Sequence, residues 1–208
     1  MTFRRFTLPV VALALAASLA ACGSDDSTDT TADTAAGTTA VAVAAPATSN
    51  GSAVLNAADI EFAQGMIAHH EQAIEMAEIA LDPNMGASAE VVDLATRIKG
   101  GQDPEVDLMT GWLDAAGEPV MMDLSEGHDM SSMEGMMTGE QMDAMAAMTG
   151  SGFDQMWLEM MIAHHEGAIA QSQAVKANGS NPEVLALADQ IITAQQGELT
   201  EMEQLLQG

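Results

Sequence analysis

The apolar residues from position 56 onward show no strand-like alternation, and turn residues divide them into helical segments. Long helices are expected at 56–81, 88–116, 151–178 and 181–207. Asn56, with an acidic residue three positions later, is a good N-cap for the first helix. A shorter helix is expected from Thr138, where a glutamine three positions later completes a capping box. The domain is therefore predicted to be all-α.

The second of these helices contains a weak point. Its middle reads Gly100-Gly101-Gln102-Asp103-Pro104. Proline lacks a backbone N–H and its ring crowds the preceding turn, so a kink or a break is expected there.

The two halves of the domain repeat each other. Met66-Ile67-Ala68-His69-His70-Glu71 recurs 95 residues later as Met161-Ile162-Ala163-His164-His165-Glu166. In the second helix of each half, Leu94, Ala95, Ile98, Gln102, Glu105 and Met109 match Leu187, Ala188, Ile191, Gln195, Glu198 and Met202 at an offset of 93. Each half is thus predicted to be one helical hairpin, and two hairpins make a four-helix bundle. The bundle domain is assigned to residues 56–208, with repeats at 56–117 and 151–208.

The N-terminal segment has the pattern of an export signal. Arg4 and Arg5 precede an apolar run that is too short to span a membrane, and small residues lead to Cys22. This arrangement resembles the bacterial lipoprotein box, in which the cysteine becomes the lipidated first residue. We therefore predict a signal peptide at 1–21 and a lipid anchor at Cys22. Residues 22–55, rich in Ser, Thr, Asp and Ala, are predicted to be a disordered tether.

Charge narrows the range of partners. After the signal peptide, 31 acidic residues remain against three basic ones, Arg97, Lys99 and Lys176. Such a surface repels nucleic acid and attracts cations. The expected partners are metal ions and, through the anchor, the membrane of a bacterium on its extracytoplasmic side.

The repeated motif carries the candidate chemistry. At 100° per residue, Met66, His69 and His70 share one face of their helix, as do Met161, His164 and His165. If the two faces meet inside the bundle, thioethers and imidazoles form a site for a soft metal ion, and copper as Cu(I) fits best. These six residues are the expected direct ligands. Met76 and Met160 lie close to the same faces and could add thioethers.

The second helices supply polar residues on otherwise apolar faces. Glu105 and Glu198 need partners there, and the histidines of the facing helices are the natural ones. They are expected either to orient the imidazoles or to bind the metal directly, together with Gln102 and Gln195.

The connection at 118–150 is a different kind of sequence, with 9 of the 18 methionines in 33 residues. His128, Met130, Met133, Met136 and Met137 are interleaved with Gly, Ser, Asp and Glu, and no core is evident for them to fill. This loop is either a flexible copper-collecting arm or a linker.

The duplicated Met-Ile-x-His-His motif, with Leu-Ala-x-x-Ile-x-x-x-Gln-x-x-Glu-x-x-x-Met behind it, resembles the domain-of-unknown-function family numbered 305 over residues 58–206. The resemblance implies a ferritin-like helical bundle, export from the cytoplasm and, for some members, copper binding.

Three functions are compatible with these patterns. The favoured one is extracytoplasmic copper binding, as a scavenger, buffer or carrier. A ferritin-like metal-dependent oxidase or peroxide-handling enzyme is the second, although the usual Glu-x-x-His motifs and tyrosine are lacking. The third is a structural envelope bundle without metal, whose paired histidines serve only as hydrogen-bonding groups in the core.

Overall fold

The protein is described by a computed structural model that covers residues 54–121 and 133–207. The predicted signal peptide, Cys22, most of the predicted tether, His128 and Met130 lie outside the described residues. Within them the chain forms five α-helices and a short 3-10 helix, and no strand. None of these helices is both long and apolar enough to cross a membrane.

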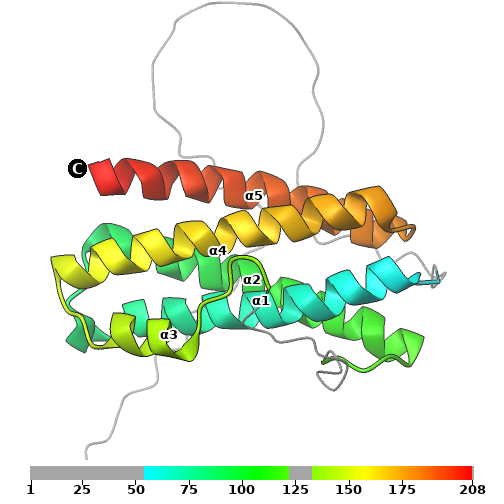
Figure 1. The fold of residues 1–208 in the computed structure, drawn as a ribbon, viewed down its shortest axis with the longest axis horizontal. Helices are drawn as coiled ribbons and strands as arrows, with labels where there is room; N and C mark the ends of the chain where they lie inside the picture. Colours follow the sequence, from blue (N-terminus) through cyan, green and yellow to red (C-terminus); the bar gives the residue numbers. More distant parts are fainter. Residues whose placement is uncertain (1–53, 122–132, 208) are drawn as a thin grey trace, which may run out of the picture. The chain divides into compact units, whose positions relative to one another are not determined.

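Two helical hairpins make up the bundle (Figure 1). The first consists of α1 (Ala57–Leu81), the 3-10 helix η1 (Pro83–Met85) and α2 (Ala89–Ala116). The second consists of α4 (Ser151–Asn178) and α5 (Pro182–Gln207). α1 packs against α2, α4 packs against α5, and α1 and α4 lie side by side in opposite directions. The expected all-α, four-helix, ferritin-like architecture is confirmed.

Local signals determine where the helices begin. Asn56 and Asp59 form the expected capping box of α1, and Thr138 and Gln141 form that of α3 (Gly139–Ala146). Ser88 caps α2, which ends at Gly117 in the left-handed conformation that glycine tolerates best.

The expected break in the second helix is absent. α2 continues through Pro104 from Ala89 to Ala116. Pro104 cannot donate a bond to the carbonyl of Gly100, but Gly100 is exposed, so water can satisfy that oxygen. Buried Gln102 and Met109 anchor the helix on both sides of the proline. Helical register is therefore kept as far as Glu105.

Two buried apolar clusters form the core, one at each end of the bundle. The first holds the last turns of α1, the first half of α2, the first half of α4 and Met202 of α5, and α3 adds Met142 and Met145. The second holds the first turns of α1, the second halves of α2 and α4 and the first half of α5. Both hairpins thus contribute to both clusters, and neither hairpin could bury its apolar face alone.

Repeat-related carboxylates connect the hairpins. Asp59 of α1 is fully buried and accepts hydrogen bonds from the backbone N–H groups of Ser180 and Asn181, both at 3.1 Å, at the start of α5. Its equivalent Asp154 on α4 accepts one from the backbone N–H of Ser88 at 3.1 Å, at the start of α2. Each first helix therefore anchors the beginning of the other hairpin's second helix.

Loss of the Asp59 carboxylate is expected to be costly, because it leaves several buried N–H groups unpaired. We expect Asp59→Ala to lower the free energy of unfolding by about 3 kcal/mol and Asp154→Ala by about 1 kcal/mol. Urea denaturation of the two variants measures the difference. Equal losses would contradict the role of burial and of the larger number of donors.

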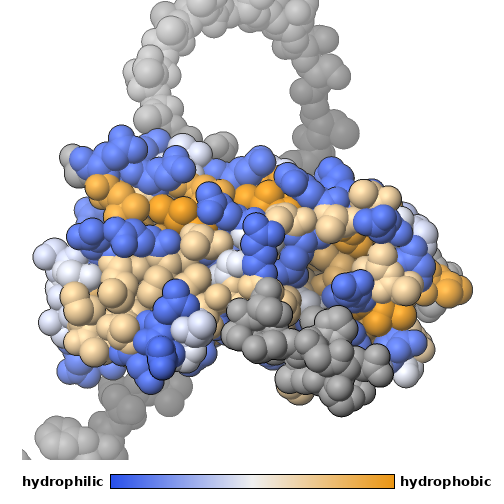
Figure 2. Space-filling model, viewed as in Figure 1, coloured by the Kyte–Doolittle hydropathy of each residue, from blue (hydrophilic) through white to orange (hydrophobic). Residues whose placement is uncertain are grey.

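The three basic residues of the domain are all paired with acids. Arg97 bonds to Asp93 and to Glu201 of α5, Lys99 to Glu78 and Asp103, and Lys176 to Asp189. Hydrophilic residues are interspersed with hydrophobic patches on the visible face of the bundle (Figure 2). The many acids beyond these pairs give the domain a negative surface.

Candidate metal centre

A layer of polar side chains separates the two apolar clusters. On each long helix, the polar residues lie between the positions that belong to one cluster and those that belong to the other. This polar layer comprises His69, His70, Gln102, Glu105, His164, His165, Gln195 and Glu198. The four histidines and two glutamines are buried, whereas the side chains of Glu105 and Glu198 keep 22% and 18% of their surface exposed.

The two halves of the layer meet at the contact between α1 and α4. The rings of His69 and His164 pack with their centroids 3.8 Å apart and their planes at 47°. The structure thus brings the two motifs together across the bundle, as the repeat predicts.

The second histidine of each motif turns toward its own hairpin partner. His70 Nε2 lies 2.7 Å from Glu105 Oε2 on α2, and His165 Nε2 lies 2.8 Å from Glu198 Oε2 on α5. Carboxylates accept hydrogen bonds, so each ring donates from Nε2, and its neutral tautomer has the lone pair on Nδ1. The expected partnership of these acids with the histidines of the facing helix is confirmed.

The histidines of the polar layer contain nitrogen atoms without hydrogen-bond partners. Both ring nitrogens of His69 and His164, and Nδ1 of His70 and His165, are buried and make no hydrogen bond. The Oε1 atoms of Gln102 and Gln195 are in the same condition. Leaving a buried polar group unpaired costs about 1–3 kcal/mol. Eight such atoms lie in this one layer, which makes it the candidate site of the bundle.

Electrostatics keep the central pair neutral. Burial, with smaller effects from His70 and His165, lowers the pKa of His69 from 6.5 to about 3. Burial, assisted by the other three histidines, also lowers the pKa of His164 well below 6.5. The backbone of Glu134 raises the pKa of His69 and so opposes these effects, although the two groups do not form a hydrogen bond. At neutral pH both rings therefore keep one unprotonated nitrogen.

The predicted thioethers occupy different surroundings. Met66 and Met161, one turn before His69 and His164, are fully buried. Met76 belongs to the first apolar cluster, two turns away from His69 along α1, and Met160 is half-buried beside that cluster. Met66 and Met161 are thus the thioethers nearest to the polar layer along their helices.

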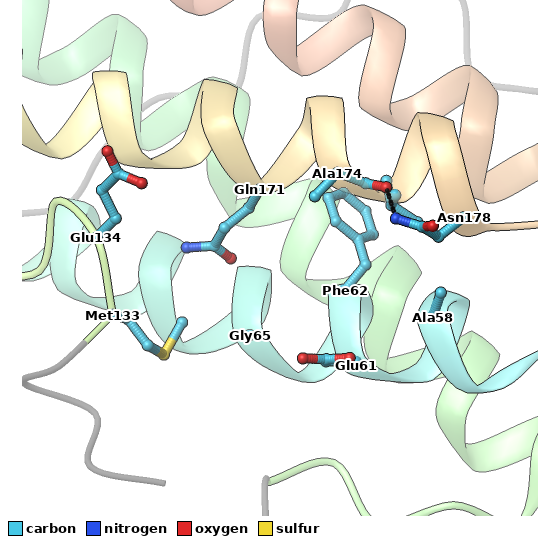
Figure 3. Close-up of a pocket in the computed structure, with 10 residues that line it drawn as sticks. Ala58, Glu61, Phe62, Gly65, Met133, Glu134, Gln171, Ala174 and Asn178 are labelled. Carbon is cyan, nitrogen blue, oxygen red and sulfur yellow. Dashed lines mark hydrogen bonds between the residues drawn. The ribbon is translucent and has the colours of Figure 1, made fainter.

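The end of the Met-rich connection is not a free arm. Met137 is buried in the first apolar cluster, and Gln72 of α1 bonds to both its backbone N–H and its carbonyl. The expectation that these methionines have no core to fill is therefore wrong for Met137. Met136 is half-buried, and Met133 lines an open groove of about 440 Å³ between α1 and α4 (Figure 3).

The histidines and carboxylates of the polar layer do not by themselves form a complete metal site. Among the described residues, no three His, Cys, Asp or Glu side chains are arranged to hold a metal ion. The Nε2 atoms of His70 and His165 are occupied by their carboxylates, which leaves Nδ1 of these two rings and the ring nitrogens of His69 and His164 without hydrogen-bond partners.

Sequence reasoning missed two residues that shape this region. Gln72 and Gly167 occupy the same repeat position, directly after the motif. Their difference was visible in the aligned repeats, but only the folded chain shows that both contact the Met-rich connection.

Residues 59–206 match the family described as Domain of unknown function (DUF305). The chain belongs to the DUF305 family. A comparison with curated proteins gives no match.

Solved DUF305 structures share this fold. A protein from Streptomyces coelicolor, described as secreted, is 30% identical, covers 72% of this chain and 90% of its own, and superposes with a TM-score of 0.65. A DUF305 fragment from Deinococcus radiodurans is 28% identical over 74% of this chain and 98% of its own, with a TM-score of 0.66.

The protein CopM is similar to this DUF305 chain as well. CopM in its Cu(II)-bound form is 33% identical over 72% of this chain and 95% of its own, with a TM-score of 0.60. CopM in its Cu(I)-bound form is 30% identical over 72% of this chain and 95% of its own, with a TM-score of 0.57. Copper binding is thus known in a protein of this fold and similar sequence.

Proposed function

We propose that this DUF305 protein binds copper, preferentially Cu(I), in the polar layer of the bundle. The ion is cargo, which the protein scavenges, buffers or carries. His69, His70, His164 and His165, with Met66 and Met161, are the proposed ligands. Gln102 and Gln195, and the Met-rich connection from His128 to Met137, remain further candidates for contacts with the metal.

The unpaired imidazole nitrogens carry this proposal. Six of them lie in one buried layer, and four belong to the two rings packed against each other. Imidazoles kept only as hydrogen-bonding core groups would have partners for their nitrogens, as most buried polar groups do. An ion with several ligand positions would satisfy many of these atoms at once.

The donor types favour a soft ion. Neutral imidazole and thioether suit Cu(I), whereas Mg²⁺ and Ca²⁺ prefer oxygen ligands. The pKa of His69, about 3, means that no proton has to leave this ring before metal binds at neutral pH.

Glu105 and Glu198 are proposed to act through the histidines. Each fixes its imidazole in the tautomer that leaves Nδ1 free. Such outer carboxylates orient metal-binding histidines in many sites and increase their basicity.

The proposed location is outside the cytoplasm. The DUF305 relative described as secreted supports export, and the N-terminal pattern supports a signal peptide at 1–21 and a lipid anchor at Cys22. The acidic surface would concentrate cations near the bundle.

Thermodynamic linkage tests the proposal on the unmodified protein. Cu(I) at about 100 times its dissociation constant is expected to raise the free energy of unfolding by about 2.7 kcal/mol. Ag(I), another soft ion, should behave similarly, and Mg²⁺ should have no effect. Denaturation under anaerobic conditions measures the shift. An unchanged stability with Cu(I) would contradict the proposed function.

A further inference from the structure

A short segment of the Met-rich connection lies across the contact between α1 and α4. We call Met133–Met137 the strap. A Cβ placed on Gly135, whose φ is +83°, would come within 2.8 Å of the carbonyl oxygen of Ala163 and 3.0 Å of that of His164. The strap backbone therefore rests directly on α4 at the second histidine motif.

Gly167 makes this close approach possible. A Cβ at position 167 would lie 2.1 Å from the carbonyl oxygen of Glu134 and 2.8 Å from the Cα atom of Gly135. No side chain, not even a methyl group, fits there unless the strap moves. Because Gly135 approaches the backbone carbonyl of His164, the same part of the strap lies beside the second histidine motif.

Gln72 holds the strap from the other helix. Its Nε2 donates to the carbonyl of Met137 at 2.9 Å, and its Oε1 accepts from the backbone N–H of Met137 at 2.7 Å. The amide thus pairs with the strap as a neighbouring strand would, and it attaches the strap to α1.

The repeat explains why this arrangement needs both residues. Gln72 and Gly167 are equivalent positions of the two motifs, so a symmetric bundle would carry the same residue at both. Two glutamines would block the strap at α4, and two glycines would leave it without its attachment at α1. The two repeats therefore carry different residues at the position where the single strap contacts both of them.

The groove between α1 and α4 ends at the strap (Figure 3). Met133 extends its thioether into the groove from the strap, and Gln171 extends its amide from α4 across it. The Nε2 atom of Gln171 is buried without a hydrogen-bond partner. Gly65, one turn before His69, forms part of the groove on the α1 side.

We propose that this groove is the route by which the metal ion reaches the histidine layer, and that the strap, closed by Gln72 and Gly167, is its gate. The inference rests on the proposed function. Met133 would offer a soft thioether to the ion at the outer side of the gate, and opening would break the two Gln72 bonds without unfolding a helix.

Release rates of Cu(I) test the gate. The copper-loaded full chain is mixed with excess of a chromophoric Cu(I) chelator, and transfer is followed by absorbance. Gln72→Ala and Gly167→Ala are each expected to accelerate release by about tenfold or more, because the open state becomes more populated. Gln204→Ala and Gly111→Ala are the matched controls, since both residues are exposed and a Cβ at Gly111 meets nothing. The controls should release copper at the wild-type rate.

A second measurement does not depend on copper. In the metal-free protein, diethyl pyrocarbonate should modify the histidines of the polar layer faster in the two strap variants than in the controls. Release and modification rates equal to those of the controls, in variants that still bind Cu(I), would overturn the gate alone. Failure of the wild type to bind Cu(I) would overturn the proposed function and the entry route with it.

Discussion

Replacement of His69 and His164 together by leucine is expected to weaken Cu(I) binding by more than about 100-fold, beyond the 10–100-fold that loss of an outer partner causes. The two rings contribute four of the six unpaired imidazole nitrogens in the polar layer, and they lie where the two motifs meet. Leucine fills a similar space but has no atom that binds copper. Competition with a Cu(I) chelator of known affinity measures the change.

A variant of the connection separates the bundle site from a site in the loop. Replacing Met130, Met133 and Met136 with leucine removes thioethers while roughly keeping side-chain volume. We expect this variant to retain the equilibrium affinity of the wild type within about threefold, because the histidine layer is unchanged. The opposite pattern, in which the loop variant loses copper and the histidine variant keeps it, would move the site to the connection.

Acidification below about pH 6.5 is expected to destabilise the metal-free protein. Both central histidines have folded pKa values far below 6.5, the value in the unfolded chain. Above pH 6.5 the rings are neutral in both states and contribute no pH dependence. Below pH 6.5 the unfolded chain takes up protons that the folded chain does not, so the free energy of unfolding decreases as the pH is lowered. For His69 this decrease continues to about pH 3.

The size of this effect follows from linkage. Between about pH 7 and pH 5.5, each of the two histidines should lower the free energy of unfolding by about 1 kcal/mol. Urea denaturation in the presence of a metal chelator measures the sum. The His69→Leu/His164→Leu variant is the control, and its stability should fall less steeply than that of the wild type over this range. A wild-type profile no steeper than that of the variant would contradict the burial of two neutral imidazoles.

The stability of the same variant without metal shows whether the polar layer lowers the stability of the bundle. Exchanging buried groups without partners for apolar side chains of similar volume is often neutral or stabilising. The metal-free leucine variant is therefore expected to be at least as stable as the wild type at neutral pH. Residues that oppose stability in an otherwise apolar core are typical of functional sites.

Much of the architecture was predictable from local patterns. Caps at Asn56 and Thr138 and the glycine after α2 act over a few residues, so the helix bounds could be read directly from the chain. The pairing of Glu105 with a histidine of the facing helix was equally predictable, because a carboxylate on an apolar helix face requires a nearby partner, and the structure selects His70. Pro104 misled the prediction, because the cost of a missing hydrogen bond depends on exposure and on packing on both sides, which the local sequence does not contain.

By itself, the sequence determined the hairpins, their duplication and the presence of a Met-His-His face on each first helix, because helical periodicity and capping are local. Only the tertiary structure decided which partner each of two adjacent histidines contacts. His69 meets His164 between α1 and α4, whereas His70 turns to Glu105 on α2. A step of 100° separates adjacent residues, and which neighbour each one meets depends on how four helices pack. The strap likewise depends on Gln72 and Gly167 lying on opposite sides of one contact, a relation between distant parts of the chain that no local pattern encodes.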